Sequence, residues 1–317
     1  MAINLKELKP HRISKNLRGK SLLLYGPPGS GKTTFGTNYK KSLLLAFERG
    51  YNALDNIMVQ DIKTWPEFKQ AISQLCRDEE FKEQFETLII DTASEAWSLC
   101  EKYICSKYDV EDLSDKAYGK LYKKAENEYH SALRELTYNG YGLVLIGHEK
   151  VTTDKDNQDI KYIAPDLAPK AFTVINKLVD NIAYIKTINT GSEEKRVMIL
   201  RDNTGKVVVK SRHKYITPYV VLGYDNFVNA LYEAIDKEAQ EHGNEAVEEL
   251  NSSARLDYDT LMIEAKDVWG QVIQQEKGQE AMAILEEEFG KSIKFSEVDP
   301  SEVEKLNAAI VRIKEIV

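Results

Sequence analysis

Short apolar runs alternate with longer amphipathic stretches along the first 150 residues of the chain. The apolar runs predict buried strands at residues 20–25, 42–47, 87–91 and 142–147. The amphipathic stretches predict helices at residues 32–40, 65–77, 93–106 and 118–138. Strands that are apolar throughout and alternate with helices are typical of a parallel sheet covered on both faces. We therefore expect an α/β fold with a mainly parallel sheet in this part of the chain.

The pattern changes after residue 150. Residues 151–166 are polar and contain a proline, and we expect a mobile loop there. A short helix is expected next, followed by alternating segments that predict antiparallel strands. The helix is at residues 167–178, the strands are at 181–188, 196–202 and 206–212, and turn residues stand at Thr190-Gly191 and Asn203-Thr204-Gly205. This β-meander would extend the parallel sheet.

The last part of the chain differs in charge as well as in pattern. Residues 224–317 hold 22 acidic and 9 basic residues, a net charge of −13, whereas residues 1–223 carry +5. We expect a core domain at residues 1–242, an acidic linker at 243–256 and about three amphipathic helices at 257–317. Acidic segments more often contact protein than nucleic acid, so the C-terminal helices are expected to form a small interaction domain.

Membrane and extracellular classes are not supported by the composition. The chain has no run of about 18 apolar residues, and its N-terminus is mixed and basic with no apolar segment behind it. We expect a cytoplasmic protein with no membrane partner. Its three cysteines form no CxxC pair, which argues against a disulfide framework or a structural zinc site.

A glycine-rich motif lies between the first predicted strand and the first predicted helix. Its residues are Gly26, Pro27, Pro28, Gly29, Ser30, Gly31, Lys32 and Thr33, and Thr34 follows them. They match the pattern GxxxxGK[ST] in full. In such a loop the backbone N–H groups surround phosphates, Lys32 reaches the β- and γ-phosphates, and Thr33 holds Mg²⁺. The motif predicts a site for ATP and Mg²⁺; the alternative is a chance glycine-rich turn.

Polar residues at the ends of three other predicted strands are candidates for the same site. Asp91 ends the third strand and is expected to hold Mg²⁺ together with the loop, or else to be an ordinary helix N-cap. Glu48 follows the second strand and is the candidate base for the attacking water, or else a loop acid paired with Arg49. His148 follows the fourth strand and could hydrogen-bond the γ-phosphate and relay its presence to residues 151–166, or be structural.

The ordered segments GPPGSGKT, LLLAFERG, LIIDT, LVLIGHEK, KLVDNIAYI and VVVKSRHKY together carry a family resemblance. They resemble the RecA/RadA type of ATPase core, most closely the short phage recombinases related to RecA that act beside single-strand annealing systems. The resemblance covers about residues 18–223. It implies a RecA-like fold, ATP hydrolysis, and assembly of a phage protein as a filament or ring with ATP between subunits. It also implies that Glu48 activates water and that His148 is a sensor.

Lys210 and Arg212 are similar to the Lys-x-Arg finger of RadA and ring helicases, which reaches the ATP site of the adjacent subunit. Positions i and i+2 of a strand face the same side, so the two cations could act together on the charge that grows on the γ-phosphoryl group. Two solvated charges on an edge strand are the alternative.

The resemblance also implies contacts with single-stranded DNA at two loops. The second loop would be residues 151–166, and the first would lie near residues 116–124, for which a charged helix face is the alternative. The candidate residues are Lys150, Lys155, Lys161 and Tyr162 for the second loop, and Lys116, Tyr118, Lys120, Lys123 and Lys124 for the first. Lysines neutralise phosphates and tyrosines stack on unpaired bases, without reading sequence.

Two other functions fit the glycine-rich motif. A P-loop kinase would carry an arginine-bearing lid, whereas residues 151–166 contain no arginine. A partner-controlled ATP switch, such as a helicase loader, would use the acidic C-terminal domain for recognition. The favoured interpretation is an ATPase that depends on single-stranded DNA and assists recombination or annealing, with a single-strand-binding protein as a possible partner of the C-terminal domain.

Overall fold

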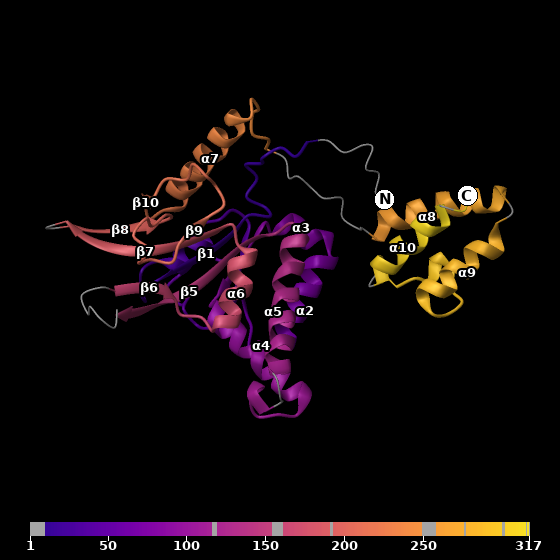
Figure 1. The fold of residues 1–317 in the computed structure, drawn as a ribbon, viewed down its shortest axis with the longest axis horizontal. Coiled ribbons are helices and arrows are strands. Elements are labelled where there is room, and N and C mark those ends of the chain that lie inside the picture. Colours follow the sequence, from indigo (N-terminus) through magenta and orange to yellow (C-terminus); the bar gives the residue numbers. More distant parts are fainter. Residues whose placement is uncertain are drawn as a thin grey trace. The chain divides into compact units, whose positions relative to one another are not determined.

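The computed structural model of the chain describes residues 10–115, 119–153, 161–190, 193–248, 258–275, 277–299, 302–314 and 316. The chain forms two compact units, whose described elements lie in residues 12–248 and in residues 258–316 (Figure 1). No described helix combines the length and the apolar character that a membrane crossing requires.

The larger unit is built on a ten-stranded sheet. Its parallel part has the order β3 (Val59–Asp61), β2 (Ser42–Ala46), β4 (Thr87–Asp91), β5 (Gly142–Thr153), β1 (Ser21–Gly26), β7 (Asn181–Thr190). Beyond β7 the strands β8 (Glu193–Ile199) and β10 (Tyr219–Val221) continue the sheet in antiparallel fashion. β6 (Lys161–Pro165) pairs with β5, and β9 (Lys210–Ser211) pairs with β7, both antiparallel. The predicted α/β class with a mainly parallel sheet is confirmed.

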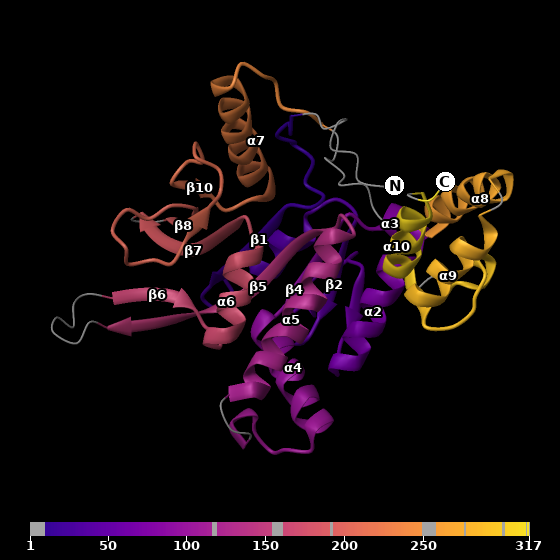
Figure 2. The same cartoon turned by 45° about the vertical axis from the view of Figure 1, so that its right-hand side comes forward.

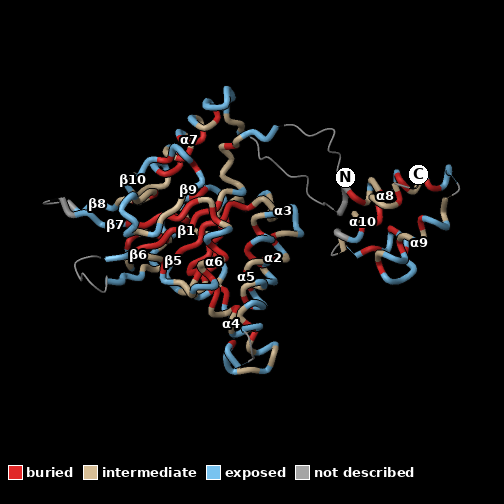
Figure 3. Tube along the Cα trace, viewed as in Figure 1, coloured by how far each residue is buried: buried red, intermediate tan, exposed pale blue. Residues whose placement is uncertain are grey.

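Helices cover both faces of this sheet because its central strands are apolar on both sides. The helices α1 (Lys32–Thr37) and α7 (Tyr224–Glu241) share one core cluster with Leu22 and Leu24 of β1. The helices α2 (Trp65–Arg77), α4 (Ala93–Tyr108), α5 (Lys120–Tyr138) and α6 (Pro169–Leu178) share the other with Leu23 and Tyr25. The short helix α3 (Glu79–Gln84) leads from α2 into β4. Buried positions therefore concentrate in the sheet and on the inner sides of the helices (Figure 3).

The predicted mobile loop at residues 151–166 is wrong in its described part. β5 does not stop at Gly147 but continues to Thr153, and it pairs with β6 from Glu149↔Pro165 to Thr153↔Lys161 (Figure 2). The backbone hydrogen bonds of two polar segments are satisfied in this antiparallel ladder, which an apolar pattern could not reveal because neither face of the hairpin is fully buried. Residues 154–160 lie outside the described residues.

The β-meander also differs from the expectation. The segment 206–212 contributes only the two-residue β9, and its first half pairs elsewhere: Ile163 N–H donates to the Lys206 carbonyl at 2.8 Å, and Val208 N–H donates to the Ile163 carbonyl at 2.9 Å. The partner of β8 on its outer side is β10, which the sequence pattern did not indicate. The predicted turn at Thr190-Gly191 lies partly outside the described residues.

The smaller unit is a helical cluster. It contains α8 (Tyr258–Gln274), α9 (Gly278–Phe289), a short 3₁₀ turn η4 (Phe295–Glu297) and α10 (Val303–Lys314), as the amphipathic pattern predicted. The helices bury an apolar core of their own, with Leu261, Val268, Leu285, Leu306 and Ile310 at its centre. The net charge of −13 counted over residues 224–317 is therefore divided between this helical cluster, the linker and α7 of the larger unit.

Candidate nucleotide site

The parallel strands bring the candidate residues to one edge of the sheet. In the strand register Gly26 lies opposite His148, and Ala46 lies opposite Asp91. The glycine-rich loop follows β1 at this carboxyl edge, and Glu48 follows β2 two residues after Ala46. Carboxyl ends of strands in open α/β sheets are where ligands bind, and four separate segments of this chain meet there.

The glycine-rich loop has the backbone that close approach to a ligand requires. Gly29 and Gly31 have φ values of +70° and +93°, in the left-handed region that favours glycine. A Cβ on Gly26 would lie 2.9 Å from the carbonyl oxygen of Ile185, so this position has no room for a side chain. The loop leads directly into α1, which begins at Lys32.

Lys32 and Thr33 are held in positions that suit a phosphate and its metal ion. The Lys32 ammonium donates to the carbonyls of Gly26 and Pro27 at 3.1 and 2.7 Å, so it folds back over its own loop. Burial lowers the pKa of Lys32 from its usual value, although the carboxylates of Asp91 and Glu48 oppose this. Thr33 Oγ1 donates to Asp91 Oδ2 at 2.7 Å.

Asp91 is a buried carboxyl at the end of β4. Burial raises its pKa, and the hydrogen bond from Thr33 opposes the rise. The N-cap of the following helix α4 is Thr92, not Asp91, so the alternative interpretation of Asp91 as an N-cap is wrong. A buried acid that is bonded to the P-loop threonine fits the role predicted for it, and that role stays a prediction.

These residues fit ATP with Mg²⁺. The Ser30 hydroxyl is buried in the loop and lacks a hydrogen-bond partner among the described residues, so it can donate to a phosphate oxygen held by the loop. The described residues offer no cluster of three or more His, Cys, Asp or Glu side chains for a metal ion. Mg²⁺ held by Thr33 and Asp91 would therefore take its remaining oxygen ligands from phosphates and water, as is usual for this ion.

Glu48 and His148 lie together above the same edge. His148 Nε2 is 3.4 Å from Glu48 Oε1, and Thr92 Oγ1 is 3.5 Å from Glu48 Oε2. The backbone N–H of Glu48 donates to the Asp91 carbonyl at 3.2 Å, which ties the loop after β2 to the end of β4. Both side chains are more than a third exposed, so water can reach them. The structure thus places the predicted base beside the predicted sensor. Glu48 pairs with His148, whereas the alternative interpretation paired it with Arg49.

Lys210 and Arg212 bind within their own chain. Lys210 Nζ donates to the carbonyls of Asn176 and Val179, the latter at 2.8 Å. Arg212 donates to the Lys177 carbonyl at 2.7 Å and to Asp180 Oδ1 at 3.0 Å. Both cations reach the C-terminal end of α6, where unpaired carbonyls and the helix dipole favour positive charge. The alternative of two solvated charges does not describe them, and the finger role stays a prediction.

The residues predicted to contact DNA are only partly described. Lys116, Tyr118 and Lys155 lie outside the described residues. Lys150, Lys161 and Tyr162 are exposed on the β5–β6 hairpin. Lys120, Lys123 and Lys124 stand in the first turns of α5, where Lys123 pairs with Glu126 at 3.4 Å and Lys124 lies over the ring of Tyr108. Lys120, Lys123 and Lys124 therefore belong to the surface of a helix, where Lys123 and Lys124 have local partners.

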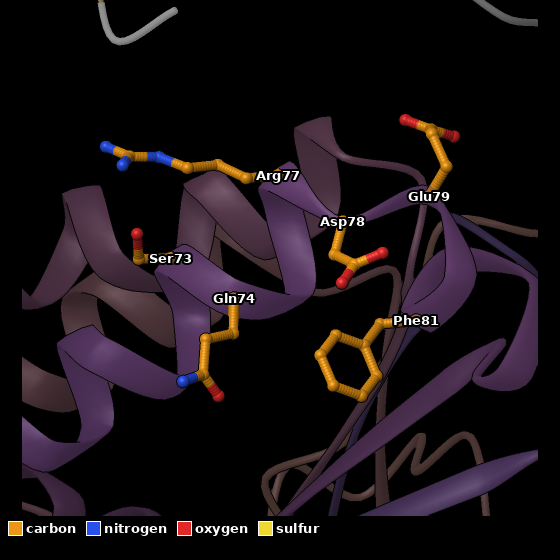
Figure 4. Close-up of a pocket in the computed structure, with 6 residues that line it drawn as sticks. All are labelled: Ser73, Gln74, Arg77, Asp78, Glu79 and Phe81. Carbon is orange, nitrogen blue, oxygen red and sulfur yellow. The ribbon is translucent and has the colours of Figure 1, made fainter.

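A large surface hollow lies elsewhere and does not suit a nucleotide. It has a volume of about 620 Å³ at the junction of α2 and α3 and is lined by Ser73, Gln74, Arg77, Asp78, Glu79 and Phe81 (Figure 4). This junction precedes β4 at the amino edge of the sheet, opposite the P-loop. Its lining has two acids and one arginine, which is unfavourable for a polyphosphate.

One residue beside the P-loop was missed by the sequence analysis. Arg196 of β8 lies next to Gly31, and a Cβ on Gly31 would be 3.5 Å from Arg196 Nη1. No motif marks this arginine, because its position depends on the pairing of β8 with β7.

Residues 18–213 match the AAA domain family. The chain belongs to this family. The matched region runs from just before β1 to just after β9, so it contains the P-loop and every candidate residue at the edge of the sheet. The chain is accordingly a P-loop ATPase of the AAA domain family, in agreement with the predicted nucleotide site. The closer kinship with phage recombinases stays a prediction.

Similarity also extends over the whole chain to a relative from Bacillus subtilis (strain 168). This chain is 28% identical to that relative, the SPbeta prophage-derived uncharacterized protein YorG, over 328 residues, which cover 100% of this chain and 99% of YorG. Two solved structures align less closely. The flagellar accessory protein FlaH of Methanocaldococcus jannaschii aligns over 65% of this chain and 85% of its own, at 10% identity and a TM-score of 0.36. The KaiC-like protein PH0186 of Pyrococcus horikoshii OT3 aligns over 67% and 99%, at 14% identity and a TM-score of 0.37.

Proposed function

We propose that this AAA domain protein is an ATPase that depends on single-stranded DNA, assembles as a ring or filament with ATP between subunits, and assists recombination or annealing. The observation that supports this most directly is the continuity of β5. The strand passes His148, beside Glu48, and runs on without a break to the exposed Lys150 and Val151. A hairpin with two exposed lysines is thus an extension of a strand that forms the nucleotide site.

The hairpin has the chemistry of a surface for unpaired nucleic acid. Lys150 on β5 and Tyr162 on β6 lie on one face of the hairpin, because Tyr162 is paired with Thr152, and the Tyr162 side chain is 40% exposed. Lys161 is an exposed cation on the other face. Lysines neutralise phosphates, and an exposed aromatic ring can stack on a base whatever its identity. A partner without sequence preference is therefore expected.

Hydrogen bonds tie the base of the hairpin to the sheet, so a movement of His148 would also move the hairpin. Asp166 N–H donates to the His148 carbonyl at 2.9 Å. The next residue, Glu149, accepts a hydrogen bond of 2.7 Å from the buried hydroxyl of Tyr184 on β7. The position of His148 and the position of the hairpin are thereby coupled through main-chain and side-chain bonds.

The roles of the chain's own residues follow from their positions. Bound MgATP supplies the phosphoryl group that is transferred to water. Lys32 would bind the phosphates in place of its loop carbonyls, and Thr33 with Asp91 would hold the metal ion. Glu48 accepts the proton of the attacking water, and His148 holds the Glu48 carboxylate in place. Lys210 and Arg212, if they leave the end of α6, complete the site of an adjacent subunit.

The kinship with YorG, a prophage-derived protein, supports a phage setting. We accordingly place this protein in the cytoplasm of a bacterial host, where phage DNA is exposed as single strands during replication and recombination.

The test is an ATPase assay with and without poly-dT, with duplex DNA of equal nucleotide content as the control. We expect strong stimulation by poly-dT and weak stimulation by the duplex. Equal rates with and without poly-dT would contradict the dependence on DNA, and a phosphorylated small molecule or protein as the product would show a kinase instead. An electron micrograph with a non-hydrolysable ATP analogue and poly-dT would show the ring or filament.

A second function, a partner-controlled ATP switch, is favoured by one observation in the smaller unit. A mainly apolar hollow of about 380 Å³ opens among α8, α9 and η4. Met262, Trp269, Met282, Leu285 and Phe295 supply the apolar lining, and Lys266 and Lys294 stand beside it. Such a hollow fits a protein partner, which could be a single-strand-binding protein. Stimulation of the ATPase by a protein alone, with no response to poly-dT, would support this function over the first.

A further inference from the structure

The β7–β8 hairpin extends past the end of β1 and forms a wall beside the P-loop. β7 runs parallel to β1 with Tyr184 opposite Tyr25, so residues 186–190 lie beyond the strand from which the loop departs. β8 returns along this extension, with Arg196 opposite Thr187. The extended strands are visible in Figure 2. Side chains on one face of this wall lie within reach of the loop.

Strand alternation places Arg196 on the P-loop side of the wall. Met198 belongs to the core cluster that contains Phe35 of α1, the helix that follows the loop. Side chains at i and i−2 share a face, so Arg196 lies on that side and Lys195 lies on the other. Consistent with this, Arg196 Nη1 and Leu222 Cδ2 would both be 3.5 Å from a Cβ on Gly31.

Among the described residues, Arg196 has only a weak side-chain partner. Its side chain forms an ion pair of 3.7 Å with Glu194, and the two side chains are 44% and 58% exposed. Such a pair contributes little to stability, so a stronger anion would displace it. The backbone of Arg196, by contrast, is fixed, because its carbonyl accepts a hydrogen bond of 2.8 Å from Leu222 N–H.

We infer that Arg196 binds the polyphosphate of the nucleotide within the same subunit. This inference rests on the proposed nucleotide site and adds a second cation to it, beside Gly31. A guanidinium offers paired N–H donors that match phosphate oxygens, and it is always charged. Because Gly31 is in the loop that surrounds the phosphates shared by ADP and ATP, the contact is made to both nucleotides. The role differs from that of Lys210 and Arg212, which are proposed to act on the neighbouring subunit.

The test is the affinity of ADP with Mg²⁺, measured by calorimetry at two protein concentrations. Arg196→Ala is expected to weaken ADP and ATP binding by about ten- to a hundredfold, the range of one charge-assisted hydrogen bond or a pair of them. Arg196→Lys should retain part of the affinity, because a point charge replaces the fork. Lys195→Ala, on the opposite face, is the matched control and should bind ADP as the wild type does.

The outcomes separate this inference from the proposed function. Wild-type affinity for ADP in Arg196→Ala would overturn the inference, and so would a loss that appears only at the higher protein concentration, since that would indicate a contact between subunits. A melting temperature equal to that of the wild type, for Arg196→Ala or for Arg196→Gln, shows that the fold is intact. A lack of stimulation by poly-dT in the wild type would refute the dependence on DNA and leave the ADP result standing.

Discussion

Thr33 Oγ1 and Asp91 Oδ2 are joined by a hydrogen bond of 2.7 Å, which links the start of α1 to the end of β4. The bond holds the two residues predicted to carry Mg²⁺ in contact before any metal binds. Asp91 is nonetheless buried, and its pKa is raised by that burial. Burial therefore disfavours the charged form of a side chain on which the predicted metal site depends.

The first prediction concerns this cost. Asp91→Asn should raise the melting temperature of the nucleotide-free protein and abolish hydrolysis of MgATP. A carboxyl whose folded pKa exceeds its unfolded value destabilises the fold above that pKa, and the penalty disappears as pH falls through the folded pKa towards the unfolded value. The gain in melting temperature should therefore be larger at pH 8 than at pH 5. Asp166→Asn, at an exposed position, is the control; a lower melting temperature for Asp91→Asn at pH 8 would contradict the argument.

The second prediction concerns Glu48. Glu48→Gln should leave MgATP binding intact while turnover falls by about 10² to 10⁴, the usual contribution of a general base. Binding is measured by calorimetry and turnover by phosphate release. The same change at Glu83, on α3 at the other edge of the sheet, should have no effect on either. Turnover in Glu48→Gln equal to that of the wild type would exclude Glu48 as the base.

The third prediction separates two roles of Lys210 and Arg212. If they act only at the end of α6, alanine substitutions should lower the melting temperature. Turnover should then fall only in proportion to the fraction of protein that is unfolded. If they also act on a neighbouring subunit, as we propose, ATP binding stays nearly intact while turnover falls by about 10³. Lys214→Ala, which removes an exposed pair with Glu241, is the control. An unchanged kcat in both substituted proteins would remove the finger role.

The fourth prediction concerns the β5–β6 hairpin. Lys150→Ala with Lys161→Ala should weaken binding to poly-dT and reduce the dependence of log affinity on log salt by about 0.7 per lysine that contacts a phosphate. Tyr162→Ala should weaken binding with little change in that slope, because stacking is not ionic. Fluorescence anisotropy over a salt series measures both. Lys40→Ala, after α1 at the amino edge, is the control, and equal slopes for the double variant and the wild type would contradict contacts by these lysines.

The sequence predicted those features that depend on local pattern. The P-loop, the apolar strands and the acid at the end of β4 are each encoded within a few adjacent residues, and the parallel topology then places Glu48, Asp91 and His148 at one edge. The polar pattern predicts a loop at residues 151–166 because the paired strands of this hairpin have no continuous apolar face.

Features that depend on long-range register were not predictable in this way. Arg196 lies beside Gly31 only because β8 pairs with β7 in one particular register and β7 extends beyond β1. Similarly, the i and i+2 spacing of Lys210 and Arg212 predicted a shared direction, but the end of α6 that receives both cations is about 30 residues away in the sequence, at 176–180.

The central claim is that the loop from Gly26 to Thr33 binds MgATP, and calorimetric titration with a non-hydrolysable ATP analogue tests it most directly. The wild type should bind the analogue saturably at one site per chain in the presence of Mg²⁺, and Lys32→Ala should weaken this binding at least a hundredfold, about 2.7 kcal/mol. No binding by the folded wild type, or equal binding by Lys32→Ala, would contradict the account.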